Sequence, residues 1–298
     1  MASHHLSTSP STHIHFTITK AQSSSSSTPL LVFLHYWGGS SATWHKQTSH
    51  TSPHTLSNVY NTVAIDLRGW GRSTGPTGTS ASSKDYSITP MASDVASILS
   101  HLQGTTALLD NGVILIGHSM GAKVTLATLP KLSESQLSLI KGLVLVAPAP
   151  PTPLILPDDM SEQQRKAYDN EASVRWTVEN ILSSAQNIAS EDMDLVVRDS
   201  LAGSTLARDG WILHGMQEDI TSALDEVSAR LAGRKVKVSV LAGAEDIVEN
   251  KDRVEMEVVG SLARRGFEVQ FEVLHGVKHL IPLESPEGVA RAVDSIVV

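Results

Sequence analysis

Hydrophobic positions along the chain follow two patterns. Near the start, Ile14, Phe16 and Ile18 alternate with polar residues, as in a strand that buries one face. From residue 30 onward the pattern changes to short, continuous apolar runs, which are typical of strands buried on both faces. Amphipathic stretches such as residues 91–102 separate these runs, and this alternation predicts βα units around a parallel sheet. The runs lie at residues 30–34, 63–65, 113–116 and 143–146.

The alternation stops at the proline-rich segment 148–153 and returns with an apolar strand at residues 236–241. Most of the sequence between them is acidic and favours helices, so we expect residues 149–212 to form a helical cap over one end of the sheet. The α/β core is thereby divided into residues 1–148 and 213–298, and its second part should contain helix 253–264, strand 267–274 and helix 285–296.

Composition narrows the possible functions. The chain has 298 residues, a net charge of -8 and no cysteine. An acidic chain without clusters of Lys and Arg is not expected to bind nucleic acid or an anionic membrane. The lack of cysteine excludes disulfides, a thiolate nucleophile and Cys-ligated zinc. With neither a secretory signal nor a long apolar stretch, we expect a cytoplasmic protein. Residues 1–12 are polar and have no apolar face, so we expect them to be flexible. Its oligomeric state is left open.

The pentapeptide Gly117-His118-Ser119-Met120-Gly121 is the strongest candidate for chemistry. It directly follows the buried run 113–116 and directly precedes a helical stretch. A strand-to-helix turn this sharp strains its central residue and requires nearly side-chain-free residues two positions away on either side, which the two glycines supply. The turn predicts that Ser119 is a nucleophile at the edge of the sheet; the alternative is a serine that only caps the helix.

Five motifs follow one another along the chain: residues 34–39 (LHYWGG), 66–73 (DLRGWGRS), 117–121 (GHSMG), 242–246 (AGAED) and 276–284 (GVKHLIPLE). With these motifs in this order, the chain resembles the α/β-hydrolase superfamily, in particular its cap-bearing members with a serine nucleophile. The resemblance extends from about Leu30 to the C-terminus and implies an α/β-hydrolase fold.

A serine nucleophile needs a histidine to accept its proton and a carboxylate to orient that histidine. In this superfamily the order is serine, acid, histidine. Only His275 and His279 follow the candidate acids. The resemblance favours His279, in a loop before the last helix, and His275 is the alternative.

The acid is expected in the turn after strand 236–241. The family spacing of a glycine, two residues and an aspartate selects Asp246, three residues beyond Gly243, and Glu245 is the alternative. Glu249 and Asp252 are expected to be solvated charges that open the next helix.

The resemblance also implies two backbone N–H donors for a developing oxyanion, those of Met120 and Trp37. Tyr36 stands where glycine is usual in the family, and the alternative is that Tyr36 and Trp37 only pack in the core. We expect His35 and Arg68 to be structural, His35 by tying the oxyanion loop to its neighbours.

These residues together predict a hydrolase that cleaves a small to medium, largely apolar ester or lactone through an acyl-enzyme. The alternatives are a C–C bond hydrolase or a thioesterase with the same triad, or a receptor without catalysis. We expect a small-molecule substrate and neither a cofactor nor a metal. The candidate substrate contacts, which could instead form the core of the cap, are Tyr36, Trp176, Trp211 and Met216.

Overall fold

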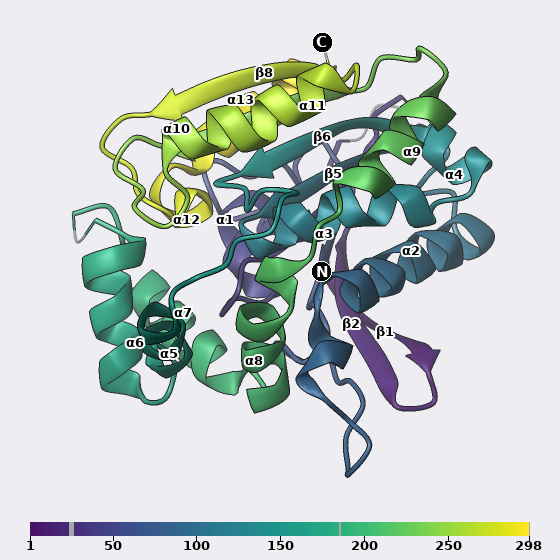
Figure 1. Ribbon diagram of the computed structural model, residues 1–298. Coiled ribbons are helices and arrows are strands. Elements are labelled where there is room, and N and C mark those ends of the chain that lie inside the picture. The colour runs from purple at the N-terminus through teal and green to yellow at the C-terminus, as the bar shows by residue number, and fades with distance from the viewer. Residues whose placement is uncertain (24–26, 185, 298) are drawn as a thin grey trace.

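A single mixed sheet organises the computed structural model, which describes residues 1–23, 27–184 and 186–297. Within these residues the strand order is β1-β2-β4-β3-β5-β6-β7-β8 (Figure 1). The β1–β2 and β2–β4 pairs are antiparallel and all the others are parallel, so the predicted α/β class is confirmed. The strands are β1 (Ala2–Ser9), β2 (Thr12–Thr19), β3 (Leu30–Leu34), β4 (Thr62–Ile65), β5 (Val113–His118), β6 (Ile140–Val146), β7 (Lys237–Gly243) and β8 (Glu268–Leu274).

The side chains of β3 alternate between two hydrophobic cores, one on each face of the sheet. Val32 and Leu34 join the core that includes α2 and α3, whereas Leu31 and Phe33 join the core that includes α13. Burial on both faces explains why the central strands are continuous apolar runs. The helices of these layers are α1 (His45–Thr48), α2 (Ile88–Thr105), α3 (Met120–Thr128), α4 (Glu134–Leu139), α9 (Thr221–Leu231), α10 (Lys251–Arg253), α11 (Gly260–Arg264), α12 (Ile281–Glu284) and α13 (Pro286–Val297).

The segment between β6 and α9 is helical, as its composition predicts. It contains α5 (Asp158–Lys166), α6 (Glu171–Thr177), α7 (Ser190–Ala202) and α8 (Thr205–Leu213). In Figure 1 the arrowheads of β6 and β8 point toward the side where these helices lie. Whether residues 149–212 act as a separate cap stays a prediction. No helix in the described parts of the chain is both long enough and apolar enough to cross a bilayer.

The start of the chain differs from the sequence-based expectation. Residues 1–12 were expected to be flexible, but they contain β1, which pairs with β2 from Ala2↔Ile18 to Ser9↔Thr12. The pairing satisfies the backbone of a segment with little apolar content, and the His4 ring stacks on Phe16 at 5.4 Å. Cross-strand contacts of polar side chains, which hydrophobic patterning does not register, therefore order this segment.

Candidate active site

Ser119 occupies the predicted sharp turn. It lies between β5 and α3 with φ 53° and ψ −115°, a backbone conformation that residues other than glycine rarely adopt. A Cβ on Gly121 would lie 2.5 Å from the carbonyl oxygens of Leu34 and His35, and one on Gly117 would lie 2.4 Å from the carbonyl oxygen of Gly121. Both positions therefore require glycine, and the turn places Ser119 at the N-terminus of α3.

His279 and Asp246 form the buried pair that the sequence predicts. His279 Nδ1 lies 2.7 Å from Asp246 Oδ2, and each residue is 2% exposed. The other carboxylate oxygen accepts the backbone N–H groups of Val248 and Glu249, at 2.8 and 3.1 Å. An ionised carboxylate held in this way keeps the proton on Nδ1 and leaves Nε2 as the acceptor. The alternatives Glu245 and His275 are both exposed and do not form this pair.

His118 joins the histidine loop to the nucleophile turn. Its Nε2 donates to the carbonyl oxygen of His279 at 2.8 Å, and the two rings lie 5.1 Å apart. This bond holds the His279 loop beside the residue that precedes Ser119. The Ser119 hydroxyl itself makes no hydrogen bond to another described residue. Catalytic hydrogen bonds are often long outside the substrate complex, so the missing bond does not argue against Ser119 as the nucleophile.

Burial and charge oppose each other at His279. Burial lowers the pKa of its imidazole, but the Asp246 carboxylate, with smaller contributions from Glu249 and Glu284, more than compensates, and the net shift is upward. Glu249 was expected to be a solvated charge, yet it is only 3% exposed. Burial raises the pKa of its carboxyl to about 7 against the attraction of Arg253, with which it forms an ion pair.

The loop after β3 carries the other predicted donor. His35 fixes its path, because His35 Nε2 accepts the N–H of Leu67 at 2.9 Å while Nδ1 donates to the carbonyl oxygen of Tyr36 at 2.7 Å. The structural role expected of His35 is thus observed. In the described chain, the backbone N–H groups of Trp37 and Met120 make no hydrogen bond to another protein group. Their binding to an oxygen of a substrate stays a prediction.

The helices between β6 and β7 hold this loop from outside, which sequence reasoning missed. The Tyr168 hydroxyl donates to the carbonyl oxygen of Trp37 at 3.1 Å, and the two rings stack at 4.2 Å. Ser200 donates to the carbonyl oxygen of Gly38 at 3.0 Å, and Ser40 donates to the buried Asp199 at 2.5 Å. Contacts between segments more than a hundred residues apart fix a loop in which Tyr36 replaces the usual glycine.

The predicted substrate contacts lie in different surroundings. Tyr36 is buried against the ring of His118 at 5.0 Å. Trp211 and Met216 are buried as well, whereas Trp176 is 53% exposed on α6. Arg68 forms a two-bond ion pair with Asp94, which is the structural role expected of it.

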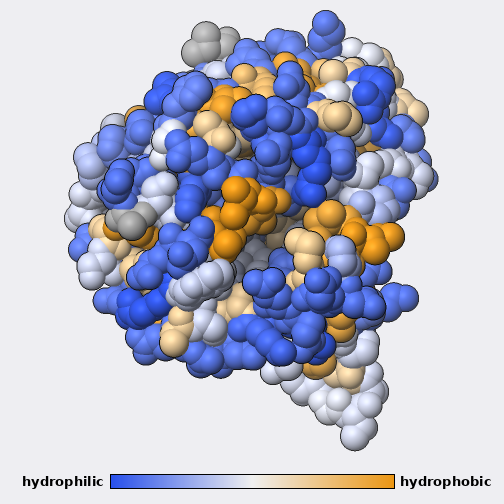
Figure 2. Space-filling model, turned by 60° about the vertical axis from the view of Figure 1, so that its left-hand side comes forward, coloured by the Kyte–Doolittle hydropathy of each residue, from blue (hydrophilic) through white to orange (hydrophobic). Residues whose placement is uncertain are grey.

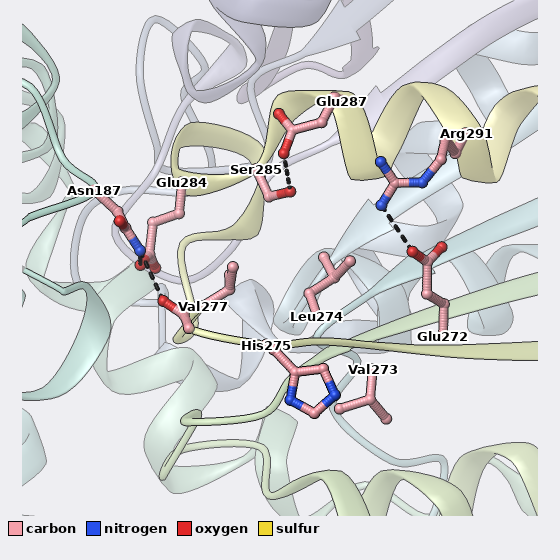
Figure 3. Close-up of a pocket in the computed structure, with 11 residues that line it drawn as sticks. Asn187, Glu272, Val273, Leu274, His275, Val277, Glu284, Ser285, Glu287 and Arg291 are labelled. Carbon is pink, nitrogen blue, oxygen red and sulfur yellow. Dashed lines mark hydrogen bonds and ion pairs between the residues drawn. The ribbon is translucent and has the colours of Figure 1, made fainter.

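A pocket of about 460 Å³ lies behind the histidine loop, as Figure 3 shows. His275, Glu272 and Glu284 line it, and Glu272 pairs there with Arg291. Its lining includes neither Ser119 nor His279, and its charged groups do not suit an apolar ester. We therefore place the candidate active site at Ser119 and not in this pocket.

Exposed apolar side chains occur on the segment that follows Asp246 and on the segment that follows β6. Ile247, which directly follows Asp246, is 64% exposed, and Ile155 and Met256 are 76% and 70% exposed. Thr152 donates to Glu257 at 2.6 Å, which joins the segment of Ile155 to that of Met256. On the face shown in Figure 2, hydrophobic side chains gather on both sides of a hollow within a mainly hydrophilic surface.

A mostly parallel sheet with a serine at a strained strand-to-helix turn and a buried His–Asp pair defines the class of α/β hydrolases. The alpha/beta hydrolase family matches residues 31–292, and the chain belongs to this family. No curated protein matches it significantly.

Solved structures share the fold at low sequence identity. An esterase from Exiguobacterium antarcticum is similar with a TM-score of 0.72 and 20% identity over 96% of both chains. A thermophilic esterase from Thermogutta terrifontis gives 0.70 and 20% over 100% of this chain and 98% of the other. An enol-lactonase from Burkholderia xenovorans LB400 gives 0.70 and 17% over 96% of both chains.

The clamp on the loop after β3 leads to a first prediction. Tyr168→Phe removes the hydrogen bond to the Trp37 carbonyl oxygen and leaves the ring stack. We therefore expect kcat on an activated ester to fall about tenfold with KM nearly unchanged. This loss is smaller than the loss caused by removing a whole oxyanion donor. Tyr86→Phe is the matched control, since Tyr86 also donates to a backbone carbonyl, that of Pro76 at 2.6 Å. Equal kinetics of the two variants would show that Tyr168 has no part in positioning the loop.

Proposed function

We propose that the protein is a serine hydrolase that cleaves a small to medium, largely apolar ester or lactone through an acyl-enzyme. The observation that carries the proposal is the buried His279–Asp246 pair at 2.7 Å, joined through His118 to the strained turn of Ser119. This arrangement supplies a nucleophile, a base and a carboxylate that orients the base.

In the proposed reaction, His279 Nε2 removes the hydroxyl proton of Ser119 as the serine oxygen attacks the carbonyl carbon. The N–H groups of Trp37 and Met120 bind the resulting oxyanion. The protonated His279 then gives its proton to the leaving alcohol, and the acyl group stays on Ser119. Water enters, His279 takes one of its protons, and the acid is released as the proton returns to Ser119.

The substrate class is inferred from exposed apolar side chains and from the structural relatives. The exposed apolar residues Ile155, Ile247 and Met256 favour an apolar substrate. A contact of Tyr36 with the acyl part stays a prediction. Roles of Trp176, Trp211 and Met216 in binding stay predictions, as does the cytoplasmic location. The structural relatives described as esterases and an enol-lactonase are consistent with both an ester and a lactone substrate.

The proposal is tested with a chain-length series of p-nitrophenyl esters. Wild type should hydrolyse at least some members, and Ser119→Ala should lower kcat about 10³-fold or more while circular dichroism shows an unchanged fold. If Ser119→Ala retains the wild-type rate, the serine mechanism is wrong. If wild type is inactive on every ester, a C–C bond, a thioester or a receptor function replaces the ester proposal.

The raised pKa of His279 predicts the pH dependence. The base must be unprotonated, so kcat/KM should fall as the pH drops through a midpoint above the ordinary 6.5 of histidine. Glu249→Gln removes one of the charges that raise this pKa, and its midpoint should move to lower pH. Glu226→Gln changes an exposed glutamate on α9 and should keep the wild-type profile. A profile that is flat to pH 4, or identical in all three proteins, would contradict the assignment.

A further inference from the structure

A second serine, histidine and aspartate are hydrogen-bonded in series on β1, on β2 and just after β4. These strands lie at the end of the sheet opposite β8. Ser3 Oγ on β1 lies 2.7 Å from His15 Nε2 on β2. His15 Nδ1 lies 2.8 Å from Oδ2 of Asp66, which follows β4. The order of atoms is that of a catalytic triad: hydroxyl, Nε2, Nδ1 and carboxylate. None of these three residues takes part in the reaction proposed for Ser119.

The carboxylate and the imidazole of this set are held as firmly as those of the His279–Asp246 pair. His15 is 1% and Asp66 is 2% exposed. Asp66 accepts the backbone N–H groups of Ser41 at 2.6 Å and Arg72 at 2.9 Å. Burial raises the pKa of the Asp66 carboxyl, but the bonds from His15 and the two N–H groups outweigh it and lower the pKa to about 2. The ionised Asp66 therefore fixes the proton on His15 Nδ1, and Nε2 accepts from Ser3.

The Ser3 hydroxyl is accessible, and a cation lies beside its imidazole partner. Ser3 lies on β1, the edge strand of the sheet, and is exposed. The Arg72 guanidinium, whose Nη1 donates to His15 Nε2 at 3.4 Å, places a positive charge beside this imidazole. The set has a nucleophile, an oriented base and a cation, but no pair of free N–H donors is described around it. Each missing donor costs about 10²–10³ in rate, so acylation without efficient turnover is expected.

We propose that Ser3 is a second nucleophile that small activated esters acylate independently of Ser119. The Ser3 oxygen forms a bond to the carbonyl carbon while His15 Nε2 takes the hydroxyl proton. The bond from the carbonyl carbon to the leaving oxygen then breaks, and His15 passes the proton to that oxygen. For p-nitrophenyl acetate the products are an acetyl ester on Ser3 and p-nitrophenol. No oxidant, metal or second substrate is required.

The same hairpin contains a matched control. Ser7 Oγ lies 2.8 Å from His13 Nδ1, so Ser7 also contacts an imidazole. In the described residues, however, no carboxylate is bonded to the His13 ring. Ser3 and Ser7 therefore differ in the presence of an orienting carboxylate, and both can be followed in one folded protein.

The experiment treats the Ser119→Ala protein with p-nitrophenyl acetate and locates acetyl groups by peptide mass spectrometry. Neutral hydroxylamine distinguishes an acetyl ester on a serine, which it cleaves, from acetamides on lysines and on the N-terminal amine. We expect one hydroxylamine-sensitive acetyl on Ser3, formed at least about tenfold faster than on Ser7, in line with the contribution of a positioned base. Ser119→Ala/Ser3→Ala should lack it, and Ser119→Ala/Asp66→Asn should form it more slowly.

Equal labelling of Ser3 and Ser7, or the absence of any ester on Ser3, would overturn the proposal. The comparison within the Ser119→Ala protein stands even if Asp66→Asn fails to fold. Because Ser119 is absent throughout, the outcome does not depend on the function proposed for the main site.

Discussion

The close contact of α3 with the end of β3 is the constraint on which the site depends. Glycine at 121 lets the helix come against the carbonyl oxygens of Leu34 and His35, and glycine at 117 lets the strand meet the helix. Ser119 then adopts a positive φ, a strain of about 1–3 kcal/mol that surrounding contacts must offset. Two of them join Ser119 to β6 and its following turn: Ser119 N donates to Val146 O at 2.9 Å, and Ala149 N donates to Ser119 O at 3.3 Å.

The same contact brings α3 against the helical segment between β6 and α9. Lys123, one turn beyond Ser119, is 1% exposed, and its ammonium donates to the carbonyl oxygens of Thr152 and Met216. These two residues lie at the start and the end of that segment. Burial lowers the pKa of Lys123 to about 8, although nearby carboxylates oppose the shift. A buried cation without these acceptors would be strongly destabilising, so the lysine ties the helical segment to the helix of the nucleophile.

The parts of the molecule that follow from local sequence were predictable. Continuous apolar runs identify the central strands, and the glycine spacing around Ser119 reports a steric requirement of the turn. Asp246 and His279 follow from family spacing. Other features depend on contacts between distant segments: β1 is ordered by pairing with β2, and Tyr168 reaches the loop of Trp37 across 131 positions of sequence. Glu249 looked like an ordinary helix-opening charge, and only the packing around it shows that it is buried.

The account predicts that the acyl group of a substrate resides for a time on Ser119. The most direct measurement mixes wild-type protein with a p-nitrophenyl ester, quenches it with acid within milliseconds to seconds, and maps the acyl group by mass spectrometry. An acyl group that appears on the peptide of Ser119 during turnover and disappears when the ester is exhausted is the result we predict. Steady hydrolysis with no acyl group on Ser119 at any time would contradict the account.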